Sequence, residues 1–86
     1  MKQSPEFFGE DVELRLVYIA KRLKEALKIE EVFNGAGLDY LVEPDTYRGG
    51  LIFQTERIGA FFYVGPGKEE EARAVLSAGG YKPYSM

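Results

Sequence analysis

Cysteine and histidine are both absent from this chain of 86 residues. Without cysteine there is no disulfide and no thiolate ligand. Without histidine, the usual metal ligand and the one side chain that titrates near neutral pH are missing. A zinc site would have to be built from carboxylates alone, which is rare. We therefore expect neither a metal site nor a cofactor.

Long hydrophobic runs are absent as well. The N-terminus lacks the apolar segment of a signal peptide, and no apolar run reaches the length that spans a membrane. We expect a soluble, cytoplasmic protein with no membrane partner. The length suits one core, so we expect a single domain over residues 12–86. A polar lead-in over residues 1–11 precedes it, and we expect the adjacent aromatics Phe7 and Phe8 to attach this lead-in to the core.

A surplus of positive charge is also missing. The chain carries 11 basic and 14 acidic residues, a net charge of -3. Nucleic-acid-binding domains usually have a basic surface, so the composition argues against this class. One local cluster is basic, and its charge is countered only by Glu25. It consists of Lys21, Arg22, Lys24 and Lys28, and we expect it to be the solvated face of a helix.

Residues 12–19 fit two patterns. Val12, Leu14 and Leu16 alternate with charged residues before a continuous apolar run, which is typical of a strand entering a buried sheet. The spacing of Val12, Leu16 and Ile19 also fits one face of a helix. We favour the strand because β-branched and aromatic residues cluster at its end, and the long-helix alternative stays open.

The rest of the chain alternates between helical and extended patterns separated by glycine and proline. The expected order is strand, helix, strand, hairpin, strand, helix, strand, which is a ferredoxin-like split β-α-β fold of the α+β class. Its sheet would be antiparallel, with both helices on one face. After the first strand, the expected elements are a helix over 23–34, a strand over 38–43 stopped by Pro44, a turn over 47–50, a short strand over 51–54, a lead-in over 55–59, a strand over 60–64, a helix over 68–78 and an edge strand over 81–84.

The glycine-rich corner at residues 65–67 precedes a helix, a position at which backbone amides can bind phosphate. Glu69, Glu70 and Glu71 fill the first turn of that helix and would repel an anion. We therefore interpret the corner as structural. Arg48 and Arg57 are more suggestive, because a guanidinium can hold a carboxylate or phosphate at two points. With Tyr40 and Tyr63 nearby in the expected fold, they are our candidate binding residues for a small anionic ligand.

The strands are apolar on both alternations. Phe61 and Tyr63 fall on one side of their strand, and Phe62 and Val64 fall on the other. Because two helices cover only one face of such a sheet, one apolar set must point outward. A large exposed apolar face marks an interface, so we expect a homodimer that pairs through Phe53, Phe61 and Tyr63.

Several core and cap positions between residues 17 and 81 resemble a family of small bacterial signal-transducing domains of unknown function. The residues that carry the likeness are Ala26, Ile29, Val32, Phe33, Ala36, Gly37, Leu38 and Tyr40, followed by Glu71, Ala72, Leu76 and Gly79. The resemblance implies a ferredoxin-like fold and a regulatory or binding role. It assigns no functional residue.

A second likeness is to RNA-recognition domains, which stack bases on aromatic residues of two central strands. The segment Val17-Tyr18-Ile19 resembles their first motif, and residues 57–64 partly resemble the second. Gly59 and Val64 stand where that second motif has aromatics. This likeness implies single-strand binding through Tyr18 and Phe61, against which the acidic net charge argues.

The leading hypothesis is a non-catalytic regulatory or interaction module that forms a homodimer. The second is a metal-independent enzyme of the dimeric α+β-barrel type, which would use tyrosine, arginine and carboxylate groups in an enclosed pocket. The third is an RNA-recognition-like single-strand binder. We name no catalytic residue.

Overall fold

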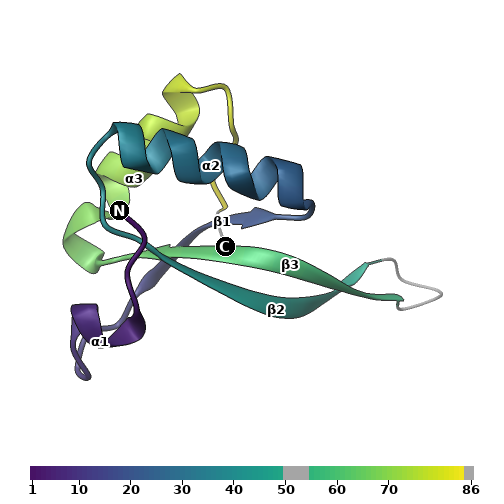
Figure 1. The fold of residues 1–86 in the computed structure, drawn as a ribbon, viewed down its shortest axis with the longest axis horizontal. Helices are drawn as coiled ribbons and strands as arrows, with labels where there is room; N and C mark the ends of the chain where they lie inside the picture. The colour runs from purple at the N-terminus through teal and green to yellow at the C-terminus, as the bar shows by residue number, and fades with distance from the viewer. Residues whose placement is uncertain (50–54, 85–86) are drawn as a thin grey trace.

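The computed structural model describes residues 1–49 and 55–84, with side chains described outside residues 45–58. Two long helices lie on one side of a three-stranded sheet (Figure 1). The fold is therefore α+β. The elements in chain order are α1 (Pro5–Phe8), β1 (Arg15–Ala20), α2 (Leu23–Gly35), β2 (Leu41–Gly49), β3 (Thr55–Val64), a 3-10 turn (Pro66–Lys68) and α3 (Glu69–Ala78).

β3 is the central strand of the sheet and runs antiparallel to both neighbours, in the order β1-β3-β2. The expected fourth strand is not formed, and residues 81–84 have no regular secondary structure. Its one backbone hydrogen bond to the sheet runs from Tyr84 N–H to the Val17 carbonyl, at 2.7 Å on the outer edge of β1. Pro83 contributes to this irregularity, since it has no N–H to donate to a ladder.

The ambiguity over residues 12–19 is resolved in favour of a strand, and the long-helix alternative is wrong. β1 begins only at Arg15, and Val12 lies outside it and is exposed. Leu16 pairs with Tyr63 and Tyr18 pairs with Phe62, so Val17 is an extra residue with no partner on β3. This β-bulge explains why the consecutive residues Val17 and Tyr18 are both buried.

The hairpin of β2 and β3 is longer than the sequence indicates. Pro44 does not stop β2, which continues to Gly49, so residues 47–49 are strand and not turn. Residues 55–59 likewise belong to β3. A proline is tolerated here because β2 is an outer strand with one side free of ladder bonds. The expected short strand over 51–54 lies outside the described residues.

The core lies between the sheet and the two long helices. Apolar residues at helical spacing bury one stripe of α2, at Ala26, Ile29 and Phe33, while α3 contributes Ala72 and Leu76. Both helices were predicted to within about a residue at each end. Gly37 and Gly80 adopt positive φ angles of 71° and 87° where the chain leaves these helices. No helix among the described residues has the length and apolar character needed to cross a bilayer.

The N-terminal segment is held differently from our expectation. Phe7 and Phe8 contact each other edge to face inside the short, unpredicted helix α1, and neither is buried. The attachment is made instead by backbone bonds, because Gln3 N–H donates to the Tyr40 carbonyl at 2.7 Å and Tyr40 N–H donates to the Met1 carbonyl at 3.1 Å. A parallel bridge at Lys2 thus extends the sheet beside the residue before β2.

Candidate functional site

The face of the sheet that points away from the helices is apolar along β1 and β3, whereas on β2 the exposed Glu43 lies on the same face, opposite Phe61. Residues paired across neighbouring strands share a face, so Leu16 lies beside Tyr63, and Ile19 lies beside Phe61. All four are half-buried and none belongs to the core cluster, which contains the opposite alternation of β3. We call this set (Leu16, Ile19, Phe61 and Tyr63) the uncovered face.

One corner of this side of the sheet is occupied by the chain itself. In Figure 1, α1 lies below the sheet near the start of β2, on the opposite side from α2 and α3. A hollow of about 470 Å³ separates the N-terminal segment from β2, and its lining includes Leu41 and Glu43 but no residue of the uncovered face. The N-terminal segment therefore shelters the start of β2 and leaves the β1–β3 surface uncovered.

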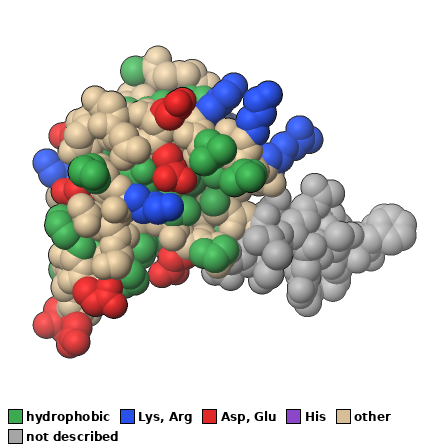
Figure 2. All heavy atoms as spheres, in the orientation of Figure 1, with side chains coloured by type: hydrophobic (Ala, Val, Ile, Leu, Met, Phe, Trp, Pro, Cys, Tyr) green, Lys and Arg blue, Asp and Glu red, His purple; other side chains and the backbone are tan. Residues whose placement is uncertain are grey.

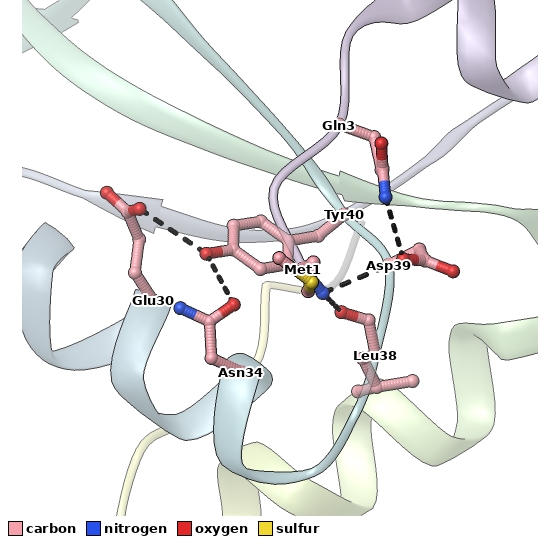
Figure 3. Close-up of polar contacts among 7 residues, drawn as sticks. All are labelled: Met1, Gln3, Glu30, Asn34, Leu38, Asp39 and Tyr40. Carbon is pink, nitrogen blue, oxygen red and sulfur yellow. Dashed lines mark hydrogen bonds and ion pairs between the residues drawn. The ribbon is translucent and has the colours of Figure 1, made fainter.

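Tyr40, a candidate ligand residue, lies in the interior. Its ring is fully buried beside Phe33 and Phe62, and its hydroxyl lies 3.3 Å from Glu30 Oε1 and 3.2 Å from Asn34 Oδ1 of α2 (Figure 3). Burial and the neighbouring Glu30 carboxylate raise the pKa of Tyr40 to about 12. The phenol therefore stays protonated and ties β2 to α2.

The backbone on either side of Tyr40 holds the N-terminal segment. In Figure 3 the Met1 amino group points at the Leu38 carbonyl and at Asp39, with the amine 3.7 Å from Asp39 Oδ1. Gln3 Nε2 donates to the same carboxylate at 3.1 Å. These contacts hold the N-terminal segment against the backbone beside Tyr40, whose side chain is buried.

The four candidate ligand residues are not gathered at one place. Tyr40 faces the helices, whereas Tyr63 lies on the uncovered face. Arg57 pairs with Tyr47, six residues along β3 from Tyr63, which corresponds to about 20 Å of strand. Arg48 pairs with Glu56, farther still along the hairpin. A ligand role for these residues stays a prediction. Of the expected interface residues, Phe61 and Tyr63 share the uncovered face, and Phe53 lies outside the described residues.

The bulge in β1 also separates the two aromatics that an RNA-recognition surface would need together. Tyr18 shares the helix-facing side with Phe62 and is only 8% exposed, whereas Phe61 points to the opposite side. Bases stacked on Phe61 would therefore have no second platform at Tyr18.

A polar cluster that the sequence analysis missed lies at the outer edge of β1. The Tyr18 hydroxyl donates to Glu25 Oε2 at 3.1 Å, and the Lys21 backbone N–H donates to Glu25 Oε1 at 3.1 Å. Burial, followed by this carboxylate, raises the pKa of Tyr18 to about 12. No sequence motif indicates the contact, because it depends on the turn between β1 and α2.

Two hollows flank this cluster. One, of about 420 Å³, is lined by Tyr18, Ile19, Lys21, Glu25, Lys82 and Tyr84. The other, of about 340 Å³, is lined by Arg22, Lys24, Glu25, Lys28 and Tyr81. The cluster of basic residues seen in the sequence therefore surrounds the start of α2 and meets the C-terminal segment there.

The described residues offer little for catalysis. Across residues 1–49 and 55–84, no three acidic side chains are placed to hold a metal ion. Within residues 1–44 and 59–84, whose side chains are described, no charged side chain is buried. The metal-independent enzyme alternative needs a buried carboxylate beside tyrosine and arginine. Tyr63 does line a hollow of about 230 Å³ that also contains Arg15, Arg73 and Glu69, but that hollow opens at the surface.

Comparison of the chain with protein-family models gives no match, and comparisons with curated proteins and with solved structures give none either.

Proposed function

We propose that this chain is a non-catalytic regulatory or interaction module that pairs with a second copy through the uncovered face. The observation that carries the proposal is the apolar set Leu16, Ile19, Phe61 and Tyr63 on the side of the sheet that the helices do not cover. An antiparallel sheet with one solvated face normally alternates apolar with polar residues. The departure from that alternation along β1 and β3 favours an interface there, with Glu43 of β2 at its margin.

The size of the surface sets the expected strength of pairing. β1 has six residues, which span about 20 Å, and the two strands that carry the uncovered face, β1 and β3, are about 10 Å wide at about 4.8 Å spacing. The flat area is then about 200 Å² per copy before the relief of the side chains is counted. This is below the area of stable specific interfaces, so we expect the pairing to be weak and transient. We expect a reversible, concentration-dependent dimer with two-fold symmetry, the commonest form of homo-oligomer.

We also propose that the fold is ferredoxin-like. The order β1-β3-β2, with β3 antiparallel to both neighbours, is the core of a ferredoxin-like split β-α-β arrangement. Tyr84 bonds to the outer edge of β1, where the fourth strand of that arrangement would lie. In this arrangement the face without helices is open to a partner, as the proposed pairing requires. We further propose that the module acts in the cytoplasm as a regulatory or signalling domain.

The pairing is tested by replacing one residue at the centre of the uncovered face. Phe61→Gln places a polar amide there, and Leu27→Gln is the matched control, because Leu27 is 54% exposed on the outer side of α2. Sedimentation equilibrium between about 10 μM and 1 mM, the range of weak specific association, measures the oligomeric state. Circular dichroism verifies that both variants fold.

We expect wild type and Leu27→Gln to dimerise with the same affinity, and Phe61→Gln to remain a monomer. A wild-type protein that is strictly monomeric at the highest concentration contradicts the proposal. Equal weakening by the two substitutions also contradicts it, since it would place the interface elsewhere.

A further inference from the structure

The basic side chains that the structure describes include an ion-paired group and a group at the start of α2. Four basic side chains away from the start of α2 form ion pairs. Lys2 pairs with Glu30, and Lys68 pairs with Glu71. Arg15 and Arg73 both pair with Glu69. Within the described part of the chain, no ion pair involves Arg22, Lys24 or Lys28 at the start of α2. These three cations are available for an external partner.

Among the side chains that the structure describes, basic residues gather in this same region on the visible face. Figure 2 shows them together at the end of the molecule next to the start of α2, while acidic side chains collect at the opposite end. The protein as a whole is acidic. A local excess of positive charge on such a protein attracts anions to one end of it.

Glu25, the single acidic residue of this cluster, is already engaged. Its two carboxylate oxygens accept hydrogen bonds from the Tyr18 hydroxyl and the Lys21 backbone N–H. It therefore shapes the turn between β1 and α2. Its single negative charge offsets only part of the charge of Arg22, Lys24 and Lys28. The start of α2 adds a further attraction for anions, since Arg22 occupies the N-cap position without a side-chain cap bond.

The surface at this place is concave. The hollow of about 340 Å³ is bounded by Arg22, Lys24 and Lys28 of α2 on one side and by Tyr81 of the C-terminal segment on the other. The neighbouring hollow of about 420 Å³ shares Glu25 and adds Lys82 and Tyr84. Each volume falls in the range of small-molecule sites.

We propose that these adjoining hollows bind a phosphate-bearing small molecule. Arg22, Lys24 and Lys28 hold its phosphate groups at the start of α2, with Arg22 able to contact two oxygens at once. Tyr81 and Tyr84 contact its organic part. The inference goes beyond the proposed pairing, because the hollow that holds the three cations is lined by no residue of the uncovered face. The neighbouring hollow adjoins that face at Ile19. The concave, tyrosine-lined shape favours a small ligand over a flat anionic surface.

Isothermal titration calorimetry of the full chain at low ionic strength tests the site, with sodium pyrophosphate and ATP as probes. The test variant is Lys24→Gln/Lys28→Gln. The control is Lys2→Gln/Lys68→Gln, which removes the same charge from two exposed, ion-paired lysines. We expect wild type to bind with Kd below about 1 mM. The test variant should weaken binding by at least about tenfold, because two charge-assisted contacts are lost, while the control changes it by less than about threefold.

The probes separate the two parts of the ligand. Equal affinity for pyrophosphate and ATP means that the phosphate groups supply the recognition, and tighter ATP binding means that the tyrosines contribute; both results support a phosphate site. Binding by Phe61→Gln at wild-type strength separates this site from the proposed dimer interface.

Three results would overturn the inference. They are the absence of saturable heat with either probe, equal weakening by the control variant, and binding only to anionic lipid vesicles or to single-stranded RNA. Amide shifts in NMR spectra provide a second readout, which should locate pyrophosphate at residues 22–28 and 81–84. Shifts confined to other residues would count against the site.

Discussion

The Tyr40 hydroxyl gives a sharp test of how α2 is joined to the sheet. Tyr40→Phe removes the hydrogen bond to Glu30 or Asn34 and leaves the buried ring and its contacts with Phe33 and Phe62 unchanged. Both acceptors lie at the molecular surface or near it and can be rehydrated in the variant. At pH 7 we therefore expect a loss of about 1 kcal/mol in the free energy of unfolding.

The difference should reverse sign at high pH. Folding raises the pKa of Tyr40 from 10.0 to about 12, through burial first and then through Glu30. Below pH 10 the phenol is protonated in both states, and its contribution to stability is fully present. Above pH 10 the unfolded chain releases this proton while the folded chain retains it, so that contribution is lost as the pH rises toward 12. The loss approaches about 3 kcal/mol. Because it exceeds the gain at pH 7, the stability curves of wild type and Tyr40→Phe should cross near pH 11.

Urea unfolding at a series of pH values from 8 to 12 measures both curves. Other titrating groups, including Tyr18, are common to the two proteins, so their difference isolates Tyr40. Glu30→Gln should reduce the loss between pH 10 and 12, because it removes a charge that disfavours the phenolate. A difference between wild type and Tyr40→Phe that stays constant over the whole range would refute the argument, since it would mean that folding does not shift this group.

Two further predictions concern the helices. Gly37→Ala should destabilise the protein by about 1 kcal/mol, because Gly37 has a φ angle of 71° that alanine adopts only with strain. Gly35→Ala should stabilise it by up to about 1 kcal/mol, because Gly35 lies in the last turn of α2 with open space where a Cβ would be. Equal shifts in the thermal midpoint of the two variants would contradict this reasoning. Leu76→Ala leaves a cavity at a fully buried position between α3 and the sheet. It should lower the free energy of unfolding, measured with urea, by about 2–5 kcal/mol. A decrease below about 1 kcal/mol would mean that α3 is not packed as described.

Much of the fold could be predicted from local patterns. The stripe of apolar residues in α2 and the glutamates that begin α3 fix both helices, and glycines fix their ends. The run from Ala60 to Val64 could only be a strand in so short a space. These signals act within a few residues of each other, which is why sequence reasoning recovers them.

The misses concern features that depend on pairing between distant residues. Pro44 was expected to end a strand, and only the outer position of β2 makes it acceptable there. The bulge at Val17 cannot be read from alternation, because it exists only relative to β3. For the same reason, the sequence could not show how far apart along the strands Tyr63, Arg57 and Arg48 lie, because their spacing depends on the register of β2 and β3. Their ligand role stays a prediction. The contact between Tyr18 and Glu25 was likewise invisible without the turn that joins β1 to α2.

The irregularities of the two outer strands together limit how copies of this chain can associate. At β1, the bulge interrupts the regular spacing of backbone groups, and Tyr84 already occupies the Val17 carbonyl. At β2, Pro44 offers no N–H, and the backbone of the N-terminal segment is bonded to the residue before the strand. Neither edge is a good template for an incoming strand, so the sheet is protected from open-ended growth into fibres. If copies pair as proposed, the broad side of the sheet is the surface left to them, and a pair formed there is closed.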